Sequence, residues 1–210
     1  PICVHYRVEP ADLNAHLFRV TLTIARPAAV QQVSLPVWIP GSYLVREFSK
    51  SLQSLQAAQA GGDLTVQQMD KCTWQVHADP AAPLVLRYDV YALDNSVRAA
   101  WLDAQRGFFN GTSLCLRVHG QEATPHTLEL AETTATKGWQ AATGLAPHKV
   151  NRRSFGTYVA ADYDELVDCP VELGRFWIGE FRAGGVPHRF VVAGAAGSFD
   201  GDRLLADARR

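Results

Sequence analysis

The sequence lacks the cysteine and histidine patterns that usually hold a metal ion. It has four cysteines, which form no C-x-x-C pair: Cys3, Cys72, Cys115 and Cys169. Their spacing argues against a zinc ribbon or a redox dithiol and predicts buried thiols. No histidine is followed by glutamate, so there is no H-E-x-x-H zinc helix. His119 and His126 are the nearest histidine pair, and we expect structural roles for both and no metal in these residues.

An excess of charge and a long apolar run are also absent. Twenty basic residues balance twenty-one acidic ones, for a net charge of -1. This balance disfavours nucleic acid and anionic membranes as partners. No segment has the apolar length of a membrane span, and the N-terminus does not read as a leader peptide. The G-x-S-x-G, G-x-x-x-x-G-K and G-x-G-x-x-G motifs are missing too, which disfavours nucleotide chemistry. We expect a cytoplasmic protein with reduced thiols.

What the chain does contain is an alternation of apolar and polar residues with a period of two. Two segments show it most clearly: Phe18, Val20, Leu22 and Ile24, and then Leu84, Leu86, Tyr88 and Val90. Such segments predict strands with one wet face. Gly61-Gly62-Asp63 and Asn110-Gly111 are predicted hairpin turns between further strands. The pattern predicts a mainly β protein, with antiparallel sheets packed as a sandwich or an open saddle.

One corner stands out because costly residues interrupt this alternation. A predicted edge strand from Val33 to Ile39 contains Pro36 and is stopped by Pro40-Gly41. The aromatic residue Tyr43 and the pair Arg46-Glu47 then follow, on backbone that should be accessible to solvent. They belong to Trp38-Ile39-Pro40-Gly41-Ser42-Tyr43 and Arg46-Glu47-Phe48. The corner can bind a ligand, or Arg46 and Glu47 can form an ordinary surface pair; the sequence leaves both open.

Two other polar clusters are candidates for a site. The segment 94–103, which leads to 107–111, combines a polar loop with small residues and aromatics. It can line a cleft, or it can be a cap on a turn over 97–102 with core anchors. The second cluster is the acidic run Asp162, Asp164, Glu165 and Asp168. A charged helix end at a domain junction explains that run better than an amine or metal site does.

Helical signals are short and occur mainly late in the chain. Asp162 is a predicted cap for a helix over 163–166, and Asp200 for an amphipathic helix that is still running at Arg210. We therefore expect an N-terminal piece of a longer protein. We place a β-domain at 1–160 and the start of a second domain at 161–210, with a strand pair around 176–181 and 188–192.

Several motifs, in order and spacing, resemble the glycyl aminopeptidase family of gluzincin zinc metallopeptidases. They are Trp38-Ile39-Pro40-Gly41-Ser42-Tyr43, Arg46-Glu47-Phe48, Tyr91-Ala92 with Asp94, Ser96-Val97-Arg98-Ala99-Ala100, Leu102-Asp103, Gly107-Phe108-Phe109-Asn110-Gly111, Ser113-Leu114, Asp162-Tyr163-Asp164-Glu165-Leu166 and Pro170-Val171-Glu172. The resemblance runs from about Val4 to the C-terminus.

The resemblance implies an enzyme of three parts. They are an N-terminal β-domain, a thermolysin-like catalytic domain that holds zinc, and a PDZ domain. The chain would contain the first part plus the opening strands and a truncated helix of the second. The whole enzyme would remove N-terminal glycine or alanine from peptides, with a zinc-activated water as nucleophile. The fragment itself would be inactive, with no catalytic residue and no metal ligand.

The resemblance also suggests roles for residues of this chain. Candidate substrate-binding residues are Asp94 for an ammonium group, Arg98 for the loop or a carboxylate, Asn110 for the turn, and Tyr43. Candidate residues for docking the catalytic domain are Trp38, Arg46, Glu47 and Phe48. The alternative is a non-catalytic β-sandwich binding or scaffolding module, in which Trp38, Tyr43 and Phe48 anchor an interface with another chain.

Overall fold

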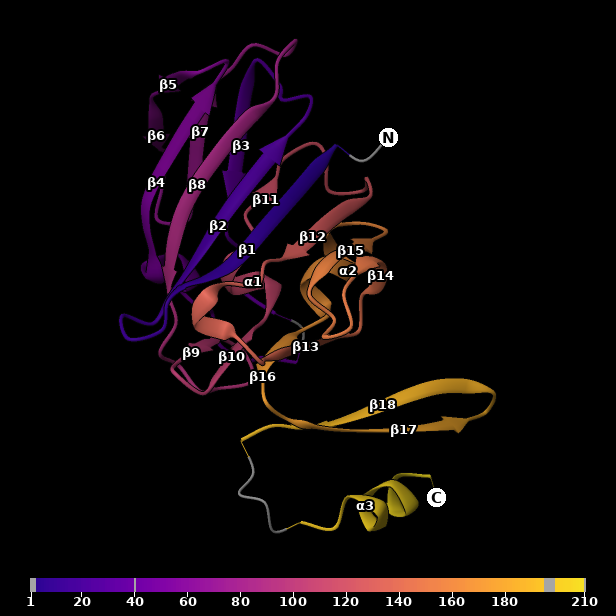
Figure 1. The fold of residues 1–210 in the computed structure, drawn as a ribbon. Helices are drawn as coiled ribbons and strands as arrows, with labels where there is room; N and C mark the ends of the chain where they lie inside the picture. The colour runs from indigo at the N-terminus through magenta and orange to yellow at the C-terminus, as the bar shows by residue number, and fades with distance from the viewer. Residues whose placement is uncertain (1–2, 40, 195–198, 210) are drawn as a thin grey trace.

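Two sheets that share a hydrophobic core form the upper part of the chain (Figure 1). The structure is a computed structural model that describes residues 3–39, 41–194 and 199–209. The larger sheet has eight strands, in the order β14 (Ala146–Val150), β15 (Gly156–Ala160), β12 (His126–Leu130), β1 (Val4–Asp12), β2 (Leu17–Ile24), β8 (Leu84–Tyr91), β4 (Leu52–Gln59) and β5 (Gly62–Leu64). The smaller sheet has the order β11 (Arg117–Val118), β3 (Val30–Ser34), β7 (Thr73–His77) and β6 (Val66–Gln68).

A third sheet and a hairpin complete the strands. The third sheet has the order β13 (Gln140–Thr143), β16 (Val171–Gly174), β10 (Arg106–Phe109) and β9 (Ala100–Leu102), and the hairpin is β17 (Trp177–Ala183) with β18 (Val186–Val192). The helices are short: α1 (Gly111–Leu114), α2 (Tyr163–Asp168), α3 (Gly201–Ala208), and the 3-10 turns η1 (Phe48–Ser51) and η2 (Thr134–Thr136). The predicted mainly β, antiparallel fold is confirmed, with β1 and β12 as a parallel pair. No helix in the described part of the chain is long and apolar enough to cross a membrane.

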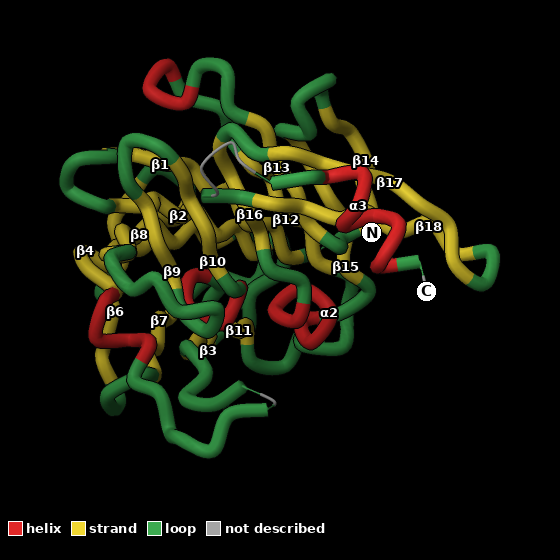
Figure 2. The backbone as a smooth tube through the Cα atoms, turned by 90° about the horizontal axis from the view of Figure 1, so that it is seen from below, coloured by secondary structure: helices red, strands yellow, loops and turns green. Residues whose placement is uncertain are grey.

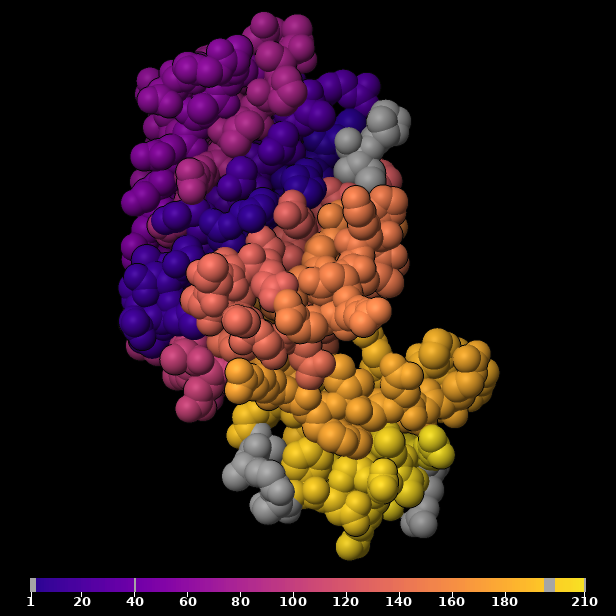
Figure 3. All heavy atoms as spheres, viewed as in Figure 1, coloured from indigo at the N-terminus to yellow at the C-terminus, as the bar shows by residue number. Residues whose placement is uncertain are grey.

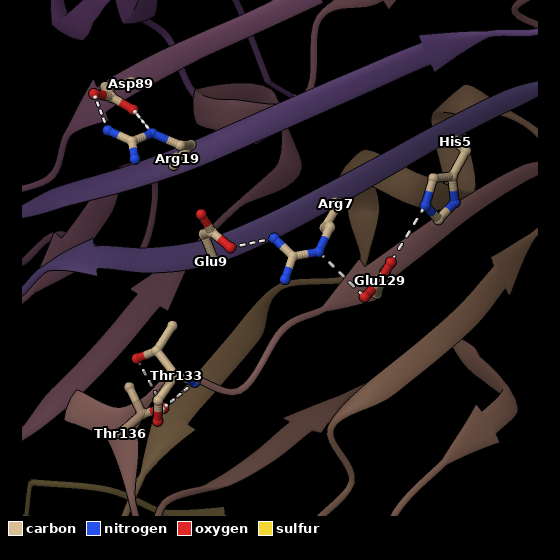
Figure 4. Close-up of polar contacts among 8 residues, drawn as sticks. All are labelled: His5, Arg7, Glu9, Arg19, Asp89, Glu129, Thr133 and Thr136. Carbon is tan, nitrogen blue, oxygen red and sulfur yellow. Dashed lines mark hydrogen bonds and ion pairs between the residues drawn. The ribbon is translucent and has the colours of Figure 1, made fainter. Parts of the chain in front are cut away.

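The alternating segments form central strands of the large sheet. In β2, Phe18, Val20, Leu22 and Ile24 are fully buried, and the apolar residues of β8 lie opposite them. Because strand side chains alternate between faces, the polar residues of these strands lie on the outer face. There Arg19 donates to both carboxylate oxygens of Asp89 at 2.8 and 3.0 Å, and Arg7 bridges Glu9 and Glu129 (Figure 4).

Two sequence-based predictions of local structure are wrong. The strand predicted from Val33 to Ile39 ends at Ser34, two residues before Pro36, which has no amide hydrogen to continue the ladder. Asn110-Gly111 is not a hairpin turn, because Asn110 has φ -88° and ψ 141° and α1 begins at Gly111. A third prediction, a capped turn over 97–102, is confirmed only in its first part. Residues 97–98 form a turn, whereas residues 100–102 form strand β9.

The predicted helix caps and the late strand pair are confirmed. The Asp162 side chain accepts from the Glu165 amide at 2.8 Å, and the Asp200 side chain accepts from the Arg203 amide at 3.0 Å. β17 and β18 pair along their whole length. Leu205 of α3 lies against Gly179 of the hairpin, where an added Cβ would come within 2.7 Å of the leucine. The hairpin and α3 form a separate lobe below the sheets (Figure 3).

The predicted domain division at residue 160 falls between β15 and α2. The α2 helix lies beside β15 (Figure 2), and β16 pairs with both β10 and β13. The β17–β18 hairpin contacts the third sheet, because Arg189 of β18 donates to the carbonyl of Thr143 in β13 at 2.7 Å. Packing therefore continues across residue 160 as far as β16, and the assignment of 161–210 to a following domain stays a prediction.

Candidate functional site

Two hollows lie on either side of helix α1. The first, which we call the η1 hollow, has a volume of about 790 Å³ and is lined by parts of 44–51 and 90–100 together with Ser113. The second, the α2 hollow, has a volume of about 1060 Å³ and is lined by parts of 34–41, Val97, Arg98, Asn110, Thr112 and one side of α2. The first volume lies within the range of about 300–1,000 Å³ that is typical of small-molecule pockets, and the second lies just above it. The corner and the polar loop singled out in the sequence thus meet at these hollows.

The corner at 37–46 is closed by hydrogen bonds within the loop. The Arg46 amide donates to the Val37 carbonyl at 2.5 Å, and the Trp38 indole donates to the Ser42 carbonyl at 2.6 Å. The Arg46 guanidinium reaches the buried Ser42 hydroxyl at 3.3 Å. These bonds hold the loop without a β ladder. Pro40, part of the predicted stop, lies outside the described residues.

Arg46 and Glu47 do not pair with each other in the part of the chain that the structure describes. Arg46 bonds Ser42, while Glu47 accepts from the Lys71 ammonium at 3.2 Å. Both residues line the η1 hollow. Phe48 is buried in the core, with 8% exposure, whereas Tyr43 is fully exposed and lines neither hollow. Tyr43 and Phe48 therefore have opposite environments.

The polar loop is fixed at both ends by its own backbone. Asp94 donates its amide to the Ala100 carbonyl at 3.0 Å and accepts from the Ser96 amide at 2.9 Å through its side chain. The Asn110 side chain donates to the Val97 carbonyl, and its amide donates to the Ala99 carbonyl at 3.2 Å. Hydrogen bonds therefore close this loop, which joins β8 to β9, at both ends and connect it to the residue before α1.

The predicted substrate-binding residues are divided between the two hollows. Asp94, which is exposed, lines the η1 hollow. Arg98 and Asn110 line the α2 hollow together with Trp38. The half-buried Arg98 guanidinium makes no hydrogen bond or ion pair with any described residue, so its charge is available to a ligand. Tyr43, the fourth predicted substrate-binding residue, lines neither hollow.

The acidic run divides between a helix cap and the α2 hollow. Asp162 caps α2, and the Glu165 carboxylate accepts from the Ala161 amide at 2.5 Å. Asp164 and Asp168 lie one turn apart and line the hollow, as does Glu165 between them. The helix-end interpretation fits Asp162 and Glu165, and it leaves the other two carboxylates facing open space.

The chain also contains side chains of the types that bind metal ions. Among the residues described, no three His, Cys, Asp or Glu side chains lie where they could share a metal ion. His119 shares a hydrogen bond with Ser34 at 2.8 Å, and His126 is buried with Nδ1 2.6 Å from the Thr124 carbonyl. Zinc therefore does not fit the side chains present in this part of the chain, and the predicted absence of metal stays a prediction.

Two residues that the sequence analysis did not propose as site residues lie in the wall between the hollows. Thr112 and Ser113 of α1 are each 4% exposed, and within the described residues neither hydroxyl has a hydrogen-bond partner. Thr112 lines the α2 hollow and Ser113 lines the η1 hollow. The signals in the sequence were the Ser113-Leu114 motif and the place of both residues after the Asn110-Gly111 pair, which suggested a turn and not a buried helix.

Comparison with known proteins gives the chain a family. Residues 5–175 match the family described as the peptidase M61 N-terminal domain. The crystal structure of an aminopeptidase N family protein from Idiomarina loihiensis is 42% identical, with a TM-score of 0.94. The match covers 98% of this chain and 35% of that protein, so the chain spans about a third of its length. No curated protein sequence matches the chain.

More distant structures share the fold only. Aminopeptidase A of Legionella pneumophila, in complex with aspartic acid, is 8% identical with a TM-score of 0.53, over 94% of this chain and 24% of that one. A two-domain M1 zinc metallopeptidase mutant bound to L-tryptophan is 13% identical with a TM-score of 0.50, over 99% and 52%. The match over 5–175 and the 42% identity to a solved relative agree with the β-rich fold described above. The chain belongs to the peptidase M61 N-terminal domain family.

Proposed function

We propose that this chain is the N-terminal β-domain of a zinc aminopeptidase that removes N-terminal glycine or alanine from peptides. The observation that carries the proposal is the family match over 5–175, joined to a 42% identical aminopeptidase-family relative of which the chain covers 35%. The zinc and its ligands would belong to the remaining part of the protein. A PDZ domain and a cytoplasmic location belong to the same proposal and rest on the motif resemblance.

In this proposal the two hollows form one wall of the substrate cleft. Asp94 is an exposed carboxylate on a loop closed by hydrogen bonds, suited to the free ammonium group of a peptide. Arg98 has an available guanidinium, suited to a carboxylate of the substrate or of the catalytic domain. Asn110 would hold the loop that carries Asp94 and Arg98, because its side chain donates to the Val97 carbonyl.

A concentrated apolar surface supports docking of the rest of the same polypeptide. In the described part of the chain, eight of the twelve exposed large hydrophobic residues come from two segments, 37–45 and 91–97: Val37, Trp38, Tyr43, Leu44, Val45, Tyr91, Leu93 and Val97. We call this set the apolar face. Exposed apolar residues gathered in one region mark an interface more often than scattered ones do. Trp38 fits the predicted docking role, Arg46 and Glu47 line the adjoining η1 hollow, and the buried Phe48 would support the face from the core. Tyr43, predicted as a substrate-binding residue, is fully exposed and belongs to the same set.

The test is Asp94→Asn in the longer protein. Loss of a charged partner for the ammonium group should reduce kcat/KM for alanyl peptides by about tenfold. Asp63→Asn, on the edge strand β5 outside both hollows, is the matched control and should leave kcat/KM unchanged. An unchanged kcat/KM for Asp94→Asn would remove that residue from the site.

A second measurement tests where the zinc is held. The fragment 1–210 alone should contain no stoichiometric zinc and show no peptidase activity, since its described residues offer no group of metal ligands. One tightly held zinc per fragment would contradict this assignment.

The apolar face also favours a second candidate, a non-catalytic module that binds another chain. The coding sequence that follows residue 210 distinguishes the two. An H-E-x-x-H helix within a domain length supports the peptidase, and a stop or an unrelated domain supports the module.

A further inference from the structure

Three buried tyrosines donate hydrogen bonds to three consecutive backbone carbonyls. The donors come from three separate elements: Tyr88 of β8 to Leu114 at 2.6 Å, Tyr163 of α2 to Cys115 at 2.8 Å, and Tyr6 of β1 to Leu116 at 2.6 Å. The Tyr88 oxygen also accepts from the Leu116 amide at 3.3 Å. All three side chains are at most 4% exposed.

These hydroxyls supply hydrogen-bond donors to buried backbone carbonyls. The segment 114–116 runs from the last residue of α1 to the start of β11, and it is completely buried. Buried carbonyls without a ladder or helix partner require another donor. Burial also raises the pKa of each of the three phenols well above its ordinary value. The hydroxyls therefore stay protonated and can donate. A phenylalanine at any of these positions would fill the same space and leave a carbonyl without its donor.

The segment 114–116 is continuous with helix α1, which separates the two hollows. Helix α1 ends at Leu114, the first residue of this segment, and its Ser113 lines the η1 hollow while its Thr112 lines the α2 hollow. On its other side α1 sits directly on α2, because a Cβ on Gly111 would lie 2.9 Å from the Val167 Cα. At the start of α1, the Asn110 side chain holds the carbonyl of Val97, the neighbour of Arg98.

We infer that Tyr6, Tyr88 and Tyr163 are positioning residues for substrate binding. They fix 114–116, thereby fix α1, and through Asn110 set the position of the loop that carries Arg98. This inference rests on the proposed function, because it requires the hollows to bind substrate. Tyr6 and Tyr88 line neither hollow, so they act only through the backbone, whereas Tyr163 also borders the α2 hollow.

The test compares Tyr88→Phe with Tyr158→Phe in the longer protein. Tyr158 is a matched control: it is 2% exposed, donates to the Ser154 carbonyl at 2.5 Å and lines neither hollow. Steady-state kinetics on an alanyl peptide should show KM raised by roughly three- to tenfold in Tyr88→Phe with kcat within about twofold. Tyr158→Phe should keep both constants. Equal changes of KM in the two variants would overturn the inference.

Amide hydrogen exchange gives a readout that does not need activity. Residues 97–114 should exchange faster in Tyr88→Phe than in the unmodified protein, and Tyr158→Phe should leave them unchanged. Should Tyr88→Phe fail to fold, Tyr6→Phe removes a single donor outside both hollows and is judged in the same way. Unchanged exchange across 97–114 would overturn the inference. An unmodified protein that cleaves no peptide would overturn the proposed function instead, while the exchange result still decides whether the tyrosines fix the wall.

Discussion

Arg106 binds both carboxylate oxygens of Glu172, with Nε–Oε1 and Nη2–Oε2 distances of 2.9 and 2.8 Å. The pair joins β10 to β16, and its side chains are 26% and 13% exposed. Burial raises the pKa of Glu172, an effect that the guanidinium of Arg106 reduces. The remaining Arg106 nitrogen, Nη1, donates to the Asn95 side chain at 3.2 Å. The third sheet is thereby connected to the polar loop that carries Asp94 and Arg98.

Removing one member of this pair should destabilise the fold. Arg106→Met leaves the Glu172 carboxylate poorly solvated and without its partner, at a cost of about 2 kcal/mol in the free energy of unfolding. Chemical denaturation of the chain measures it. Lys71→Met is the control, because its partner Glu47 is also exposed and such pairs contribute little. A loss no larger than that of Lys71→Met would show that the buried pair is not a stabilising contact.

The buried His126 should make stability depend on pH. Burial lowers the pKa of its imidazole, although the Thr124 carbonyl and the carboxylates of Asp162 and Glu122 act in the opposite direction. The unfolded chain therefore binds the proton more tightly, and the free energy of unfolding falls as pH drops from about 6.5 through the folded pKa.

His126→Phe isolates this contribution. The variant loses the bond to the Thr124 carbonyl and so should be less stable at pH 7. Its stability should then change less between pH 7 and pH 5 than that of the unmodified chain, as measured by urea denaturation across that range. The same slope in both proteins would exclude His126 as the titrating group.

Gly111 should tolerate no side chain. A Cβ at this position would lie 2.9 Å from the Val167 Cα and 3.0 Å from the Leu166 carbonyl oxygen, and neither backbone can move without shifting α2. Gly111→Ala should lower the free energy of unfolding by about 2 kcal/mol. Gly62→Ala, where the nearest atom is 3.8 Å away, should change it by less than about 0.5 kcal/mol. Similar effects for the two substitutions would mean that α1 and α2 are less closely packed.

The apolar face should promote association of the isolated chain. Val45 and Val97 are 75% and 71% exposed, so replacing both with serine removes apolar surface without opening the core. The double variant should unfold at the same denaturant concentration as the original chain and self-associate less in sedimentation velocity. The matched control replaces Val30 and Val186, which are exposed outside the apolar face. Equal association in both double variants would contradict a specific interface.

The sequence by itself determined those parts of the structure that depend on near neighbours. The alternation in β2 and β8 decides which face of each strand is buried, because strand side chains point to opposite faces in turn. Asp162 and Asp200 cap their helices through bonds to amides three residues later. The motifs at 38–48 and 94–111 also indicated where the polar loops and the hollows lie.

Only the tertiary structure decided what depends on residues far apart in the chain. Asn110-Gly111 has the composition of a hairpin turn, yet Gly111 is needed because α2 packs on it. Asp94 and Arg98 are neighbours in one loop, but α1 places them at different hollows. The three tyrosines read as ordinary core residues until the fold brings their hydroxyls to 114–116. Local patterns specify torsions and faces, whereas close packing and the demand of buried carbonyls for donors act only once distant segments meet.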